Sequence, residues 1–211
     1  MKKYALLVLL ALGTLSTYAQ VSFGLKAGYS NSNIKFEDNE GISRLSAWHA
    51  GVIADLSLSE DFSLQPQLLV SAKGAQQGGV SVGGLNVGGT KMSLTYLELP
   101  VNFMYKIKAG SGKFFIGVGP YIAYGIGGKI GDQKIKFDGK SFEEVGEGDE
   151  NAHLKALDFG GNILAGYELK NGLLFSINYS MGLTDISADD EKSKNNYFGV
   201  SVGYLLHTKK K

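Results

Sequence analysis

The chain has 211 residues, and 30 Gly against only 3 Pro and no Cys is an unusual composition for a soluble globular protein. Without cysteine, a disulfide scaffold and a cysteine-based zinc module are excluded. Lys and Arg number 21 and Asp and Glu number 20, so there is no surplus of positive charge to neutralise a run of phosphates, and nucleic acid is not an expected partner.

The N-terminal residues have the three parts of a secretory signal peptide. Two lysines at positions 2 and 3 precede an apolar run over residues 4–12, which is too short to span a bilayer. Residues 17–19, Thr-Tyr-Ala, approximate the small-x-small cleavage pattern. We therefore expect a signal peptide at residues 1–19 and a mature domain at residues 20–211, whose fold the following patterns predict. A first helix of the mature domain is the alternative interpretation.

Eight segments of the remaining chain alternate between apolar and polar residues with a period of two, and this pattern predicts β-strands with two unlike faces. No other segment approaches 18 consecutive apolar residues, so no transmembrane helix is predicted. The eight segments are, in chain order, Phe23 to Tyr29, Trp48 to Leu58, Phe62 to Val70, Leu97 to Ile107, Phe114 to Tyr124, Leu157 to Leu169, Leu173 to Leu183 and Phe198 to Leu206.

The connections between these segments alternate in length. Short connections are expected at residues 59–61, 108–112 and 170–172, and long ones at 31–45, 75–93, 127–155 and 185–195. An even number of strands, short periplasmic turns and long external loops are typical of bacterial outer-membrane barrels. The predicted fold is therefore all-β: an eight-stranded antiparallel up-and-down transmembrane β-barrel in the outer membrane, with both termini in the periplasm.

One face of the predicted strands is apolar, and the other consists mostly of small, uncharged residues. A soluble lipocalin-like barrel would instead expose a polar face rich in long charged side chains. Aromatic residues near the strand ends predict the two girdles of a membrane barrel, with the core of a β-sandwich as the alternative. The predicted girdle residues are Phe23, Tyr29, Trp48, Phe62, Tyr105, Phe114, Tyr124, Phe159, Tyr167, Phe175, Phe198 and Tyr204.

Seven charged residues fall on the face predicted to line the lumen. Because a charge enclosed in a narrow barrel must be paired or hydrogen-bonded, we interpret them as lumen ion pairs. A gated ion path and an acid/base pair are the alternatives. The candidates are Lys73, Glu98 and Asp158 near the external end, and Lys26, Asp55, Lys106 and Glu168 lower in the barrel.

All three prolines, Pro66, Pro100 and Pro120, fall inside predicted strands. Proline lacks the N–H that a ladder hydrogen bond requires, and a closed barrel has no free edge where this loss would be harmless. We therefore expect β-bulges at the prolines.

The sequence predicts no catalytic residue, no metal site and no cofactor. The histidines, His49, His153 and His207, fall on the second strand, the longest loop and the last strand, which does not favour a shared metal. The Gly-rich stretches 78–89 and 125–131 lack the spacing of a phosphate-binding loop and open no helix.

The longest connection, residues 127–155, is rich in charge and is interpreted as a solvated external loop. Between residues 132 and 151 its apolar residues are essentially Ile135, Phe137, Phe142 and Val145, so this segment should contribute little to a core and should be dispensable for folding. The alternative is that Phe137 or Phe142 folds back to plug the mouth of the barrel.

Several short motifs on the predicted strands resemble the outer-membrane β-barrel family common in Bacteroidetes, often called PorT-like or porin-family proteins. The resemblance implies an eight-stranded outer-membrane barrel with Pro100 and Pro120 at expected positions, and it implies no catalytic residue or ligand. The motifs are Gly24-Leu25-Lys26-Ala27-Gly28, Tyr96-Leu97-Glu98-Leu99-Pro100-Val101, Gly117-Val118-Gly119-Pro120-Tyr121, Asp158-Phe159-Gly160, Gly166-Tyr167-Glu168 and Gly182-Leu183-Thr184-Asp185.

The function predicted from these features is that of a non-enzymatic, monomeric outer-membrane scaffold that presents external loops for surface interaction, with at most narrow passive solute passage. The alternative is a lipid-modifying enzyme on an eight-stranded barrel, because fold alone does not exclude catalysis. The expected partners are outer-membrane lipid and lipopolysaccharide, periplasmic chaperones and the barrel-assembly machinery during insertion, and a surface ligand that the sequence does not identify.

Overall fold

The computed structural model describes residues 20–35, 42–77, 80–82, 85–87, 89–145, 149, 151–188 and 192–206. The expected signal peptide at residues 1–19 and the end of the chain, including His207, lie outside the described residues. In the part of the chain that is described, no helix is long and apolar enough to cross a membrane.

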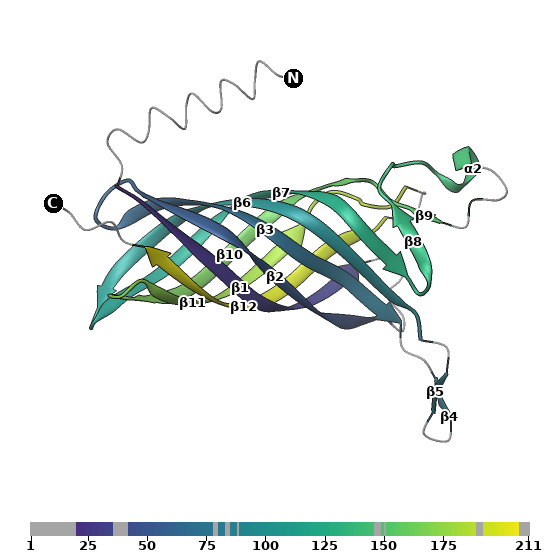
Figure 1. Cartoon of the computed structure of the whole chain (residues 1–211), viewed down its shortest axis with the longest axis horizontal. Helices are drawn as coiled ribbons and strands as arrows, with labels where there is room; N and C mark the ends of the chain where they lie inside the picture. The colour runs from purple at the N-terminus through teal and green to yellow at the C-terminus, as the bar shows by residue number, and fades with distance from the viewer. Residues whose placement is uncertain are drawn as a thin grey trace, which may run out of the picture.

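Eight long antiparallel strands form a closed barrel (Figure 1), so the predicted fold is confirmed. Each strand pairs with the next one along the chain, and the last strand pairs with the first. The strands are β1 (Gln20–Lys35), β2 (Ile42–Ser57), β3 (Phe62–Gln77), β6 (Lys91–Ala109), β7 (Gly112–Ile130), β10 (Leu157–Leu169), β11 (Leu173–Gly182) and β12 (Lys194–Leu206).

Short elements lie in two of the long connections, at the end of the barrel opposite the three short turns (Figure 1). The hairpin of β4 (Val80–Val82) and β5 (Leu85–Val87) forms a separate two-stranded sheet between β3 and β6. Between β7 and β10 lie β8 (Gln133–Lys136), α2 (Phe142–Val145) and β9 (Ala152–His153). Strand β8 continues the sheet from β7 and pairs in parallel with β9.

The strands extend beyond the alternating segments from which they were predicted. The connections expected to begin at residues 31, 75 and 127 begin later, because β1, β3 and β7 continue to Lys35, Gln77 and Ile130. Hydrogen-bonded pairing continues there although the outward residues are no longer apolar. Period-two hydrophobicity marks only the part of a strand that faces lipid. It therefore underestimates the length of strands that continue beyond the bilayer.

The three prolines lie on three neighbouring strands, with Pro66 on β3, Pro100 on β6 and Pro120 on β7. Each has a partner on the following strand in the sheet, whereas its pairing with the preceding strand is interrupted. The register is the same on both sides of each interruption, and the register shifts lie elsewhere, between Arg44 and His49 and between Thr95 and Tyr96. The expected bulges at the prolines are therefore wrong: the wall loses ladder contacts locally without inserting a residue.

The outward face of the wall is apolar, and its aromatic residues lie toward the two ends of the barrel. Toward the end that carries the long connections, Tyr29 lies opposite Trp48 in the register. Near the other end, the rings of Phe62 and Tyr105 lie 5.0 Å apart, as do those of Phe114 and Tyr167. Large apolar side chains such as Trp48, 52% exposed, are expected on a surface that meets lipid rather than water.

Candidate functional site

The lower lumen contains one lysine between two carboxylates. The Lys106 Nζ lies 2.9 Å from Asp55 Oδ2 and 3.1 Å from Glu168 Oε2. The Ser63 hydroxyl and the Gln65 amide each donate to Asp55 Oδ2 at 3.1 Å. The charges come from β2, β6 and β10, and no two of these strands are adjacent. This group therefore joins separate parts of the wall through the lumen.

The upper lumen repeats the arrangement with more complete burial. The Lys73 Nζ lies 2.9 Å from Glu98 Oε2 and 3.2 Å from Asp158 Oδ2, and none of the three side chains is more than 1% exposed. Strand β3 supplies the lysine, and β6 and β10 supply the carboxylates. One cation faces two carboxylates, so the group has a formal charge of −1.

Three tyrosines surround the upper lysine. The Lys73 Nζ lies 4.4, 5.1 and 5.5 Å from the ring centroids of Tyr121, Tyr96 and Tyr197, distances at which the negative face of an aromatic ring stabilises a cation. Two of these tyrosines also donate hydrogen bonds to the carboxylates: the Tyr197 hydroxyl donates to Glu98 Oε1 at 3.0 Å, and the Tyr121 hydroxyl donates to Asp158 Oδ1 at 3.3 Å.

Lys26 is also buried in the lumen, and among the described residues it forms no ion pair. The Lys26 Nζ donates to Gln67 Oε1 at 3.4 Å, and the Gln67 amide donates to Gln65 Oε1 at 3.0 Å. Lys26 was expected among the lower ion pairs, and the structure instead places it beside neutral amides. Gln67 and Gln65 connect it indirectly to Asp55, because the Gln65 amide also donates to that carboxylate.

His49 lies inside the lumen between two serines. Its Nδ1 is 2.7 Å from the Ser30 hydroxyl and its Nε2 is 2.7 Å from the Ser201 hydroxyl, and the residue is 2% exposed. A Ser–His pair is therefore present, but Ser30 occupies the position at which a catalytic triad has a carboxylate. Among the described residues, no cluster of His, Cys, Asp or Glu suits a metal ion.

Large side chains fill the lumen where glycines make room for them. A Cβ on Gly166 would lie 2.4 Å from the Phe115 ring, and a Cβ on Gly160 would lie 2.6 Å from the Tyr121 ring. Between the two charged groups, an apolar layer adds further bulk. Its members are Ile53, Met104, Phe115, Leu164, Leu174 and Leu205.

The longest connection packs on the mouth of the barrel at the end opposite the short turns (Figure 1) and is part of the core. Ile135 on β8, 7% exposed, packs with Leu94, Tyr96 and Ile186 in one buried cluster. The Phe137 ring lies 5.7 Å from the Tyr96 ring in an edge-on contact. The expectation that residues 132–151 contribute little to a core is therefore wrong. The alternative, in which Phe137 folds back to the mouth of the barrel, matches the position of this residue. The Phe142 side chain lies outside the described residues.

Ion pairs hold this covering segment, which we call the cap (β8, α2, β9 and the residues between them), in shape. The Lys136 Nζ lies 2.6 Å from Asp149 Oδ2, and the His153 Nδ1 lies 2.8 Å from Asp138 Oδ1. The hydrogen bond from His153 lowers the pKa of Asp138, and the hydrogen bonds from Lys136 and Asn151 lower the pKa of Asp149.

These lowered pKa values predict that acid loosens the cap. A carboxyl group whose folded pKa is depressed stabilises the fold above its unfolded pKa of about 3.9, and the contribution is lost as the pH falls through the folded value. We therefore expect amide hydrogen exchange in the cap, corrected for intrinsic rates, to accelerate between pH 5 and pH 2.5, while amides in the middle of β7 stay protected. Equal protection of the cap at both pH values would contradict this prediction.

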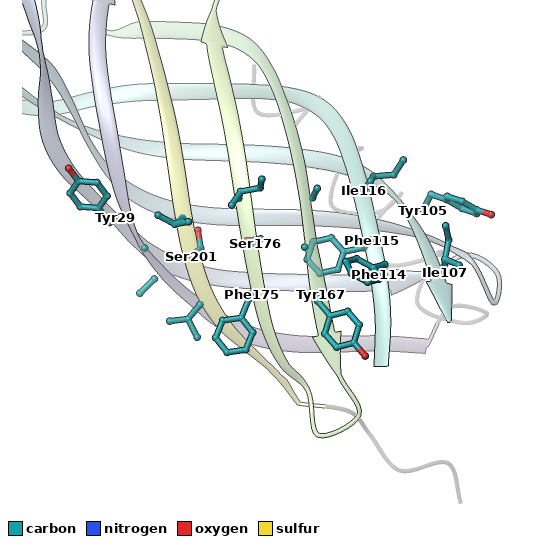
Figure 2. A pocket seen from close by; sticks show the side chains of 17 residues that line it. Tyr29, Tyr105, Ile107, Phe114, Phe115, Ile116, Tyr167, Phe175, Ser176 and Ser201 are labelled. Atoms are coloured by element: carbon teal, nitrogen blue, oxygen red, sulfur yellow. The ribbon is translucent and has the colours of Figure 1, made fainter. Parts of the chain in front are cut away.

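An apolar hollow lies on the outside of the wall. It has a volume of about 750 Å³ and is almost entirely apolar, with outward residues such as Tyr105, Phe114 and Phe175 at its border (Figure 2). Small residues, Ala27 and Ala165, lie among the larger ones. A shallow apolar hollow on a lipid-facing wall suits acyl chains, and we assign it no chemistry.

A closed barrel with an apolar outer wall and a charged, filled lumen is the structure of an outer-membrane β-barrel protein. A family model described as outer membrane protein beta-barrel domain matches residues 17–188. The chain therefore belongs to this family, and it is a protein of the outer membrane. No curated protein matches the chain.

Several solved structures are similar to this chain in overall arrangement. The attachment invasion locus protein Ail of Yersinia pestis, solved with the heparin analogue sucrose octasulfate, is 12% identical, with a TM-score of 0.45 over 89% of this chain and 99% of that one. Neisserial surface protein A is 10% identical, with a TM-score of 0.49 over 87% and 97%. The N-terminal barrel of Pseudomonas aeruginosa OprF is 12% identical, with a TM-score of 0.39 over 89% and 99%.

Proposed function

We propose that the protein is a non-enzymatic, essentially closed barrel that presents its cap and neighbouring loops outside the cell for surface interaction. The cap carries this proposal, because it is a folded structure packed on the barrel mouth through Ile135 and held by ion pairs. A segment that only connected two strands would not require these contacts. Its exposed residues of both signs suit a polar or charged surface partner.

The orientation of the barrel follows from this proposal. We propose that the cap faces the outside and that both ends of the chain lie in the periplasm, as short turns on the periplasmic side imply. A peptide epitope inserted after Gly139, at a turn with positive φ, should bind antibody on intact cells. The same epitope after Lys211 should bind only after the outer membrane is permeabilised. The reverse pattern would overturn the proposed function.

Conductance of the purified barrel should be very small. The lumen contains buried ion pairs and aromatic side chains, among them Tyr96, Phe115 and Tyr121, and an eight-stranded barrel is only wide enough for side chains to fill it. Planar-bilayer recordings should therefore show at most brief, small openings. Large, stable single-channel currents would contradict a closed scaffold.

A lipid-modifying enzyme is the alternative function, and the Ser201–His49 pair is the observation that favours it. Both residues lie inside the lumen, and Ser30 rather than a carboxylate contacts the other ring nitrogen, so we propose that the pair is structural. Lipid profiles of cells carrying the normal chain and His49→Gln should be the same. A lipid species that disappears with His49→Gln, at normal protein levels, would establish the enzyme instead.

We also propose that the chain belongs with the PorT-like proteins of Bacteroidetes within its family. The motifs around Pro100 and Pro120 support this placement, because the structure arranges these prolines as neighbours on β6 and β7.

A further inference from the structure

Six exposed cations lie on the outward face of the wall at its external end, in two groups of three. The first, which we call the β1 cluster, contains Lys35 on β1, Arg44 on β2 and Lys194 on β12. The second, the β7 cluster, contains Lys91 on β6, Lys129 on β7 and Lys134 on β8. In the order of strands around the barrel, β1 and β7 are separated by three strands in either direction, so the clusters lie on opposite sides.

Each cluster contains two lysines directly opposite one another in the strand register. Lys35 faces Lys194 across the β1–β12 pair, and Lys129 faces Lys134 across the β7–β8 pair. Like charges at such positions repel each other. Within the ranges that the structure describes, none of the six cations forms an ion pair, so no described carboxylate balances the charge of either cluster.

The other end of the barrel shows how such repulsion is relieved when a carboxylate is available. There, Lys108 faces Lys113 across the β6–β7 pair, and Lys108 Nζ lies 3.3 Å from Glu60 Oε2. Lys155, near the β7 cluster side of the external end, likewise pairs with Asp185 at 3.0 Å. The two clusters therefore differ from these paired cations in the same way: no described carboxylate pairs with them.

The clusters lie at the depth of lipid headgroups. Arg44 is four residues above Trp48 on β2, and Lys194 is four residues above Phe198 on β12. Four residues of a strand tilted by about 40° rise roughly 10 Å above the aromatic girdle. The headgroup layer occupies roughly the first 5 to 8 Å outside the hydrocarbon region, and long Lys and Arg side chains reach down into it.

We propose that the β1 and β7 clusters each bind the phosphate groups of a phosphorylated lipid in the outer leaflet. Phosphate is the anion that this depth provides, and three cations on neighbouring strands match a headgroup with more than one negative charge. The apolar wall directly below accommodates the acyl chains. The proposal rests on the orientation proposed above, with the long connections outside the cell, but not on what the cap binds.

Native mass spectrometry of the refolded barrel in detergent tests this proposal, with bisphosphorylated lipid A as the probe. We expect two bound lipids on the wild-type barrel and one on the triple variant Lys35→Ser, Arg44→Ser, Lys194→Ser. The triple variant Lys91→Ser, Lys129→Ser, Lys134→Ser should also retain one. Each cation near an anionic surface contributes about fivefold in affinity, so the affected site should weaken roughly a hundredfold.

The matched control removes three lysines from the opposite end: Lys108→Ser, Lys113→Ser, Lys170→Ser. It should retain both lipids, and heat-shifted gel migration should show that every variant is folded. Lipid A without its phosphates should not bind at the clusters, and inorganic phosphate alone should not compete at millimolar concentration, which separates a lipid site from a free-phosphate site.

The proposal would be overturned if dephosphorylated lipid A bound equally well, if the control variant lost as much lipid as the cluster variants, or if inorganic phosphate competed fully. In the sequence, Glu37, Asp38 and Glu40 follow Lys35 and lie outside the described residues, and Asp132 precedes Lys134. If these acids were the counter-ions, the wild-type barrel would bind no lipid until they were neutralised, a result that also overturns it. The epitope experiment on the cap is independent of all these outcomes.

Discussion

Lys73→Met should destabilise the barrel by about 3 to 5 kcal/mol, the effect expected when a buried charge loses its partner. The substitution keeps an unbranched side chain one atom shorter than lysine and removes the cation that lies between Glu98 and Asp158. Two carboxylates, each at most 1% exposed, would then face each other without a counter-charge. Urea unfolding in liposomes, followed by heat-shifted gel migration, measures the loss.

Combined substitutions separate a charge effect from a packing effect. Lys73→Met with Glu98→Gln and Asp158→Asn should be more stable than Lys73→Met alone, because no unpaired charge remains. If the triple variant were less stable than Lys73→Met by the sum of the single changes, the three side chains would not act as one ion-paired group.

The second carboxylate also changes the effect expected of Glu98→Gln. If Glu98 were the sole partner of Lys73, this change would leave a buried lysine without a counter-charge. In the structure Asp158 remains 3.2 Å from Lys73 Nζ, so the single substitution should be milder than Lys73→Met. A Glu98→Gln barrel as unstable as Lys73→Met would show that Asp158 does not compensate.

The strands and their two faces could be predicted because each depends on neighbours in the sequence. A period-two pattern places Lys73, Glu98 and Asp158 in the lumen without any knowledge of the barrel's stagger. Which carboxylate reaches which lysine depends on that stagger, since β3 and β10 are not adjacent. The sequence therefore supplied the residues of the upper group, and the closed structure shows that one lysine joins both carboxylates.

The partners that complete this group were not predictable from pattern. Tyr197 and Asn195 lie at the start of β12, before the alternating segment begins at Phe198. Even so, Tyr197 contacts Glu98 and Asn195 contacts Asp158. The relation between the prolines was hidden for the same reason. Pro66 and Pro100 are distant in the chain, and only the register places Pro66 opposite Val101, beside Pro100.

The cap shows a different limit of sequence reasoning. Its two apolar contacts, Ile135 and Phe137, lie in a segment dominated by charge, and two residues are too few to produce a periodic signal. A Cβ on Gly125 would lie 2.3 Å from the Phe137 ring, so this glycine leaves the space into which the ring packs. A single Gly opposite a single Phe is a relationship that only the folded chain reveals.

Excising residues 132–151 should destabilise the barrel by about 2 to 4 kcal/mol, contrary to what the charge-rich sequence suggests. The excision removes the burial of Ile135, worth about 1.5 to 3 kcal/mol for a fully buried side chain, together with the smaller contribution of the half-buried Phe137. It also exposes Leu94 and Tyr96 to water at the mouth. The urea midpoint of the refolded protein, read by heat-shifted migration, should fall accordingly.

A shorter excision, residues 139–148, provides the matched control because it keeps Ile135, Phe137 and the pairs of Asp138 and Asp149 with His153 and Lys136. It removes a charged external tip whose length changes loop-closure entropy only slightly. This variant should therefore unfold at nearly the wild-type urea concentration. If both excisions were equally harmless, the cap would not contribute to the stability of the barrel. If both were equally damaging, the tip rather than the two apolar side chains would hold the mouth closed. Only a difference between the two assigns the stability to the contact of the cap with the core.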